Sequence, residues 1–145
     1  MAVRRVEPEQ AAQLLEEGWV YLDVRSVAEY AEGHAPGAYN IPLLDFEPGQ
    51  GLRPNTNFLV EVLAAFSPEQ PIVVACKAGG RSARAAAMMA ESGFTTVVDM
   101  RGGFYGEVDP DGRVACAGWA AVGLPVVSGD EPGRSHSDLR RDEPA

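Results

Sequence analysis

Short apolar runs alternate with stretches of helical periodicity along this chain. Four runs that are rich in β-branched residues predict strands, and these are Val3–Val6, Trp19–Val24, Ile72–Ala75 and Thr95–Val98. Apolar spacing, a capping pattern or a lack of helix breakers predicts helices between them, in the segment from Glu7 to Gly18, in Ser26–Tyr30, in Phe58–Phe66 and in Arg81–Ala90. Strands that alternate with helices in this way predict an α/β domain.

Two segments have the composition of loops or tails. Asn40–Leu43 continues a short strand into residues 44–57, whose glycine, proline and asparagine content predicts an irregular connection along one side of a pocket. Residues 128–145 are charged and poor in apolar side chains, which predicts a flexible tail after a single domain over residues 1–127. His136 lies in this tail, and we assign it no role from the sequence.

One cysteine follows the most apolar run directly. Cys76 comes after Ile72–Ala75, and a short turn leads from it to the helix over Arg81–Ala90. A helix N-terminus favours an anion, and Gly79 and Gly80 can turn successive N–H groups toward the sulfur. The adjacent cations, Lys77 and Arg81, favour the nucleophilic thiolate in the same way. The alternative is a buried structural cysteine beside a glycine turn.

Composition and charge narrow the function classes. The chain has 145 residues, which fits one domain with a real core, and its formal net charge of -9 argues against broad affinity for nucleic acids or anionic membranes. No apolar stretch predicts a signal peptide or a membrane anchor. Two cysteines form no disulfide framework, and a reactive thiol fits a reducing, cytoplasmic location. The spacing of His, Cys and carboxylates indicates no metal site.

Three ordered motifs resemble the rhodanese sulfurtransferases. Cys76-Lys77-Ala78-Gly79-Gly80-Arg81-Ser82 is similar to the family's active-site loop. Upstream, Tyr21–Arg25, Glu29–Tyr30 and Gly33–Pro42 resemble its other hallmark, and Gly118–Val126 resembles its closing segment. The similarity extends roughly from Val3 to Val127. One copy is present, so the chain resembles the single-domain members rather than the tandem ones.

The resemblance implies a fold and an activity. The fold would be an open, mostly parallel central sheet flanked by helices on both faces. The activity would move sulfane sulfur from a small anionic donor such as thiosulfate to a thiophilic acceptor, namely cyanide, a thiol or a protein. Cys76 would hold this sulfur as a persulfide, without a cofactor. The residues that would bind the donor and stabilise the persulfide are Lys77, Ala78, Gly79, Gly80, Arg81 and Ser82.

Three residues are expected to support this loop. Asp23 should lie at the same edge of the sheet as Cys76, because the carboxyl ends of parallel strands meet there. It would anchor the loop through Arg81 or loop amides, or pair with Arg25, or cap the following helix; we favour an anchor over a proton-transfer role. The resemblance implies that His34 orders a turn through hydrogen bonds with Arg25 or Glu29 and is not a catalytic base.

The chain departs from the family pattern after its last predicted strand. Asp99–Phe104 resembles the family's glycine pair, but residues 105–116 are then inserted, with a strong turn signal at Asp109-Pro110-Asp111-Gly112. This insertion would border the pocket or decorate the surface. Cys116 ends it, either as a resolving cysteine for Cys76 or, as we favour, as a small half-buried residue before a helix at Trp119.

Three other functions stay open at this stage. A phosphatase or arsenate reductase of related fold has five residues between the cysteine and the arginine, whereas Lys77–Gly80 is four, which leaves less room for a tetrahedral anion. A non-catalytic binding module would not need Cys76. A persulfide carrier or redox relay for a partner protein is the more serious alternative, because it would use the same cysteine.

Overall fold

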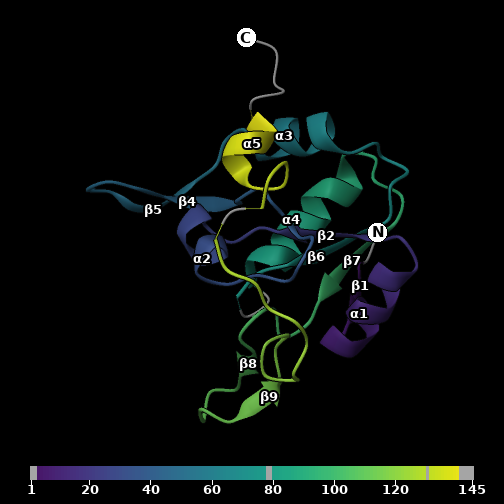
Figure 1. Cartoon of the computed structure of the whole chain (residues 1–145), viewed down its shortest axis with the longest axis vertical. Coiled ribbons are helices and arrows are strands. Elements are labelled where there is room, and N and C mark those ends of the chain that lie inside the picture. The colour runs from purple at the N-terminus through teal and green to yellow at the C-terminus, as the bar shows by residue number, and fades with distance from the viewer. Residues whose placement is uncertain (1–2, 78–79, 130, 141–145) are drawn as a thin grey trace.

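A parallel sheet of five strands forms the centre of the molecule (Figure 1). The structure, a computed structural model, describes residues 3–77, 80–129 and 131–140. The sheet order is β1-β7-β6-β2-β3, and each neighbouring pair runs parallel. The strand bounds are β1 Arg4–Val6, β2 Val20–Asp23, β3 Tyr39–Asn40, β6 Ile72–Ala75 and β7 Val97–Met100. The apolar run over Ile72–Ala75 is therefore the middle strand, and all four of its residues are buried.

Helices cover both faces of this sheet, which confirms the expected fold class. Because side chains alternate along each strand, the faces carry two separate cores. Leu22 and Val74 belong to the core under α3 (Phe58–Ala65) and α4 (Gly80–Glu91). Tyr21 and Val73 belong to the core on the opposite face, which includes buried residues of α1 (Pro8–Glu16) and α2 (Val27–Glu32).

The strand register gathers polar residues at the carboxyl edge of the sheet. Asp23 at the end of β2 lies opposite Ala75, and Cys76 is the next residue after Ala75. Asp23 and Cys76 therefore lie at the same edge of the sheet. Asp99 in β7 lies opposite Val74 of β6. The predicted meeting of Asp23 and Cys76 at one edge is thus a property of the fold, and Asp99 joins them from the other side.

Two antiparallel hairpins extend from the sheet in different directions (Figure 1). The first pairs β4 (Leu44–Glu47) with β5 (Gly51–Pro54), so the irregular connection expected over residues 44–57 is wrong in this part. The expectation failed because proline and glycine at positions 48–51 form a tight turn between paired strands instead of an open loop. The second hairpin pairs β8 (Glu107–Val108) with β9 (Val114–Cys116) inside the insertion.

The turn predicted in the second hairpin is present. The Asp109 carboxylate accepts hydrogen bonds from the backbone N–H groups of Asp111 and Arg113, at 3.0 and 2.9 Å. The helix expected at Trp119 is absent, because the chain there forms successive turns. The Trp119 ring is nonetheless buried, and its N–H donates to the Pro125 carbonyl at 2.7 Å.

The C-terminal segment is packed on the domain, although its composition suggested a flexible tail. The backbone of Val127 pairs with His34, and α5 (His136–Arg140) follows at the end of the described chain. Leu139 packs against the core under α3 and α4, and the His136 ring lies 3.1 Å from both carboxylate oxygens of Glu61. Composition missed these contacts because a few specific polar pairs and one apolar residue, Leu139, hold the segment, and its overall composition does not reveal them. Residues 130 and 141–145 lie outside the described residues.

Candidate functional site

Cys76 lies at the end of the middle strand β6, where the chain turns into α4. Its side chain is 2% exposed. Lys77 is exposed, and its ammonium nitrogen is 5.9 Å from the centre of the Tyr105 ring. Ala78 and Gly79 lie outside the described residues, so the expected nest of loop N–H groups stays a prediction. Gly80, Arg81 and Ser82 form the first turn of α4.

The segment that follows β7 and contains Gly102 and Gly103 contacts the backbone of this loop. The N–H of Phe104 donates to the Cys76 carbonyl at 2.7 Å, and the N–H of Tyr105 donates to the Lys77 carbonyl at 3.0 Å. Gly103, with φ +56°, lies so close that a Cβ there would overlap the Cys76 carbonyl oxygen. The backbone of the loop is therefore fixed at its first two residues by a segment that requires glycine.

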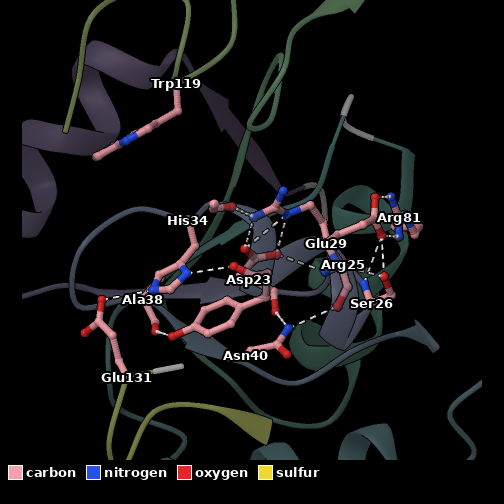
Figure 2. Close-up of polar contacts among 12 residues, drawn as sticks. Asp23, Arg25, Ser26, Glu29, His34, Ala38, Asn40, Arg81, Trp119 and Glu131 are labelled. Carbon is pink, nitrogen blue, oxygen red and sulfur yellow. Dashed lines mark hydrogen bonds and ion pairs between the residues drawn. The ribbon is translucent and has the colours of Figure 1, made fainter. Parts of the chain in front are cut away.

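Asp23 and Arg25 form a buried ion pair beside the loop (Figure 2). The Arg25 guanidinium donates to the Asp23 carboxylate at 2.7 Å through Nη2 and to the Gly33 carbonyl at 2.7 Å. It also lies over the Phe104 ring, with 4.3 Å from Cζ to the ring centre. Burial is the largest influence on the pKa of Arg25 and would lower it, but the hydrogen bond to Asp23 and the charge of Asp23 together raise it. Of the alternatives for Asp23, the structure shows the pair with Arg25.

Asn40 ties the same corner together. Its side-chain amide donates to the backbone carbonyls of Asp23 and Arg25, both at 3.0 Å. The side chain is fully buried and comes from β3, the edge strand next to β2. No local pattern reveals this role of Asn40, because an asparagine in a short strand carries no signal of its long-range partners.

Arg81 pairs with Glu29, and not with Asp23 (Figure 2). Two nitrogens of its guanidinium bond to the two carboxylate oxygens of Glu29, at 2.8 and 3.1 Å. Glu29 also accepts from the backbone N–H of Ser26 at 3.0 Å, as the capping pattern at the start of α2 predicted. Burial would raise the pKa of Glu29, but the hydrogen bonds with Arg81 and Ser26 prevail and lower it from 4.5 to about 2.

This pair positions the cation near the cysteine. The pKa of Arg81 is raised, first by its hydrogen bonds with Glu29 and further by charge at Cys76 and Asp23. Arg81 is 18% exposed on its side chain, so it can contact a bound anion while it remains tied to α2. The capping pattern revealed Glu29 as a helix cap, but no sequence signal reveals its second partner 52 residues away.

His34 contacts the C-terminal segment instead of the cysteine loop (Figure 2). Its Nδ1 lies 2.8 Å from the Tyr30 carbonyl oxygen and its Nε2 lies 3.0 Å from Glu131. The ring is fully buried and stacks on Tyr30, with 3.7 Å between ring centres. Both ring nitrogens are thus engaged in holding a turn, although with other partners than the expected Arg25 or Glu29. Composition does not reveal Glu131 as the partner of His34, because residues 128–145 have the composition of a flexible tail.

The cysteine thiol contacts a hydroxyl, which in turn contacts a buried carboxylate. The Cys76 Sγ donates to Ser82 Oγ at 3.4 Å, and the Ser82 hydroxyl donates to Asp99 Oδ1 at 2.5 Å. Arg5 Nε lies 3.0 Å from the other oxygen of Asp99. Burial raises the pKa of Asp99, although the hydrogen bond from Ser82 and the charge of Arg5 oppose this rise. The sequence reveals no role of its own for Asp99, because it directly follows the predicted strand Thr95–Val98 and no local pattern reveals its contact with Ser82.

The chain is similar to a known protein family, to curated proteins and to solved structures. The sequence pattern described as "Rhodanese-like domain" matches residues 7–107. The chain belongs to the rhodanese-like domain family. It is 37% identical to Thiosulfate sulfurtransferase 16, chloroplastic, of Arabidopsis thaliana over 116 residues, which are 80% of this chain and 86% of that protein. It is 35% identical to Thiosulfate sulfurtransferase GlpE of Pseudomonas paraeruginosa over 101 residues, 70% of this chain and 80% of that protein.

Solved structures agree with the rhodanese-like fold. The crystal structure of Rv0390 from M. tuberculosis superposes with a TM-score of 0.74 at 29% identity and covers 89% of this chain and all of that one. The resemblance drawn from three motifs is thereby confirmed, and so is the open, mostly parallel sheet. The matched range of the family ends at residue 107, so the second hairpin from Val108 onward and the C-terminal segment lie beyond it.

The described residues of this rhodanese-like domain contain neither a metal-ligand cluster nor a membrane-spanning helix. In the described part of the chain, no group of three or more His, Cys, Asp or Glu side chains is placed to hold a metal ion. Over the same residues, no helix combines the length and the apolar character that crossing a bilayer requires.

Proposed function

We propose that this rhodanese-like domain transfers sulfane sulfur from a small anionic donor, such as thiosulfate, to a thiophilic acceptor through a persulfide on Cys76. The observation that supports this most is the position of Cys76 between the carboxyl end of β6 and the first turn of α4, with Arg81 held beside it. Relatives that carry the name thiosulfate sulfurtransferase share this chain's family. A helix start with two neighbouring cations suits an anionic donor better than a neutral one.

The first half-reaction forms the persulfide. The Cys76 thiolate attacks the outer sulfur of thiosulfate, a new sulfur–sulfur bond forms, and the bond of the donor breaks so that sulfite leaves with its electron pair. Lys77 and Arg81 bind the donor and stabilise the charge that develops on the leaving sulfite. The loop amides of Ala78, Gly79 and Gly80, together with the Ser82 hydroxyl, stabilise the persulfide.

The second half-reaction returns the cysteine. A thiophilic acceptor attacks the outer sulfur of the persulfide, and the electron pair of the broken bond returns to Cys76. Cyanide serves as the acceptor in an assay, and a small thiol or a protein thiol serves in the cell. Asp23 and Arg25 act as supports beside the loop, and His34 supports the turn that joins the C-terminal segment. We propose that no metal or organic cofactor takes part, and that the protein works in the cytoplasm, although one relative is named as chloroplastic.

Sulfur transfer from thiosulfate to cyanide by the purified protein tests the proposal. The wild type and the Cys116→Ser variant should both turn over with ping-pong kinetics, and Cys76→Ser should be inactive. Cys116→Ser is the matched control, because it removes the other thiol by the same atomic exchange. Full activity in Cys76→Ser, or none in the folded wild type with any sulfane donor, would overturn the assignment.

A further inference from the structure

A continuous hydrogen-bonded path leads from the cysteine sulfur to a buried carboxylate. The path runs from Cys76 Sγ to Ser82 Oγ over 3.4 Å and from Ser82 Oγ to Asp99 Oδ1 over 2.5 Å. Cys76, Ser82 and Asp99 are 2%, 0% and 1% exposed, respectively. They come from the end of β6, from α4 and from β7. Bulk water therefore has little access to the path, and the cysteine and the carboxylate are linked through one hydroxyl.

The direction of these hydrogen bonds depends on the charge of Asp99. An ionised carboxylate only accepts, so the Ser82 hydroxyl must give its proton to Asp99 and offer a lone pair to the sulfur. That arrangement gives a thiol an acceptor at Ser82 and withholds the Ser82 proton from a thiolate, whatever other groups of the loop contribute. When Asp99 carries a proton, the Ser82 hydroxyl is released and can donate to the sulfur instead.

We propose that Asp99 is a positioning residue that controls the protonation state of Cys76 through the Ser82 hydroxyl, so that the cysteine and the carboxylate share one proton. The proposal rests on the role of Cys76 as the nucleophile given above and adds a residue that acts on it. While the shared proton lies on Cys76, Asp99 is ionised, and transfer of this proton to Asp99 leaves the thiolate that attacks the donor. A resting thiol is also protected, because the thiolate is the form that oxidants attack.

The proton then moves in step with the sulfur. As Cys76 attacks the donor, its proton passes to Ser82 Oγ while the Ser82 hydroxyl proton passes to Asp99 Oδ1. The persulfide is left with its charge on the outer sulfur, and neutral Asp99 keeps the proton. When the acceptor removes that sulfur, the returning charge on Cys76 takes the proton back by the reverse path. Charge and atoms balance in both halves without any further reactant.

The charged groups around the path fit this assignment. Arg5 on β1 holds the second oxygen of Asp99, and Glu107 on β8 adds a negative charge nearby. Burial raises the pKa of Asp99, which makes the carboxyl a better temporary proton acceptor than an exposed one. Tyr21 on β2 and Arg81 on α4 also interact electrostatically with Cys76.

A double-variant cycle that follows alkylation of Cys76 against pH tests the proposal. Every variant carries Cys116→Ser, so that iodoacetamide reports on a single thiol and no sulfur transfer is needed. Asp99→Asn keeps the shape of the side chain but carries no charge, and its amide N–H can donate to Ser82, which frees the Ser82 hydroxyl to donate to the sulfur. We expect it to move the midpoint of the alkylation profile to lower pH and to speed alkylation at neutral pH about fivefold, the size of one net hydrogen bond.

The second arm removes the link and keeps the carboxylate. Ser82→Ala should move the midpoint in the same direction, and Asp99→Asn added to Ser82→Ala should move it little further. Equal shifts from Asp99→Asn with and without Ser82 would mean that charge acts directly through space, and an unchanged midpoint would mean that Asp99 does not act on Cys76. Either result overturns the proposal.

One further variant keeps the test valid if Asp99→Asn does not fold. Ser82→Thr retains the hydroxyl and should keep the profile of the parent, whereas Ser82→Ala should not. The same profile for both variants contradicts a role for the hydroxyl. Because alkylation does not involve thiosulfate, failure of this proposal is distinguishable from failure of the sulfurtransferase assignment, which the cyanide assay tests on its own.

Discussion

The surroundings of the two cysteines differ far more than their burial does. Cys76 is 2% exposed and Cys116 is 8% exposed, and no disulfide joins them. The Cys76 thiol meets a hydroxyl that is linked to a carboxylate. The Cys116 thiol lies 3.7 and 3.6 Å from the backbone carbonyl oxygens of Arg101 and Ala117. Carbonyl oxygens only accept hydrogen bonds, so they favour the thiol and offer a thiolate nothing.

The comparison shows that burial does not by itself decide whether a cysteine reacts. Burial raises the pKa of Cys116, the two carbonyl oxygens beside its sulfur only accept hydrogen bonds, and the charge of Arg101 does not offset the burial. Cys76 is as buried, but its neighbours can change from acceptor to donor and a helix begins a few residues away. The preferred view of Cys116 as a small packed residue agrees with its surroundings, and a resolving role finds no support in them.

Exchange of each thiol for a hydroxyl should separate the two sites by the largest margin. Cys76→Ser should lower sulfur-transfer activity at least about a thousandfold, because serine is a far weaker nucleophile at neutral pH. Cys116→Ser should stay within about twofold of the wild type, because its sulfur only packs. Steady-state rates with thiosulfate and cyanide measure both. A large loss in Cys116→Ser would give that cysteine a chemical role.

The glycine pair allows each cysteine environment to be disturbed separately. A Cβ on Gly103 would overlap the Cys76 carbonyl, whereas a Cβ on Gly102, with φ +82°, would lie 3.1 Å from the Cys116 sulfur and 2.9 Å from the Ala117 oxygen. Each change to alanine should destabilise the fold by about 2 kcal/mol or more, because of the clash and the positive φ. Gly103→Ala should also lower the activity per folded molecule, and Gly102→Ala should not. Thermal unfolding together with the cyanide assay separates the two effects.

Alkylation should distinguish the cysteines by a smaller factor. The raised pKa of Cys116 keeps it a thiol to higher pH than an ordinary cysteine, and the thiolate is the form that alkylates. Iodoacetamide at mildly alkaline pH should therefore modify Cys76 at least about tenfold faster than Cys116. Peptide mass spectrometry over time gives both rates. Faster modification of Cys116 would contradict the comparison.

The weakest expected effect concerns the ion pair that holds Arg81 beside Cys76. Since the pKa of Glu29 is lowered from 4.5 to about 2 in the folded state, Glu29 stabilises the fold above pH 4.5 and loses that contribution as the pH falls toward 2. Glu29→Gln should cost about 1 kcal/mol at neutral pH, since the pair is partly exposed. Wild type and variant should converge near pH 2 in chemical unfolding. A gap that persists there would assign the cost to packing instead of charge.

The fold was largely predictable from local patterns. The apolar run over Ile72–Ala75 is typical of a strand covered on both faces, and the capping pattern at Ser26 and Glu29 marked the start of α2. The hairpin of β4 and β5 was missed because its turn residues also occur in irregular loops. Only pairing between two distant stretches of backbone distinguishes these structures, and local composition does not record such pairing.

The site was predictable where its parts are adjacent in sequence and not elsewhere. Cys76, Arg81 and Ser82 share one loop and helix turn, so a motif could reveal them. Asp99 and Glu29 reach the site from other elements, and only the strand register and the packing of α2 bring them there. Glu131 and His136 were hidden for a related reason, because two carboxylate–imidazole contacts are enough to hold a segment that composition describes as loose.

The central claim is that Cys76 carries sulfur as a persulfide, and its most direct test is the intact mass of the Cys116→Ser protein after treatment with thiosulfate. The account predicts a gain of one sulfur atom, located on the peptide that contains Cys76, and its complete removal by cyanide. The Cys76→Ser variant should gain nothing under the same conditions. If the folded protein gains no sulfur from thiosulfate or any other sulfane donor, or gains it at another residue, the account is contradicted.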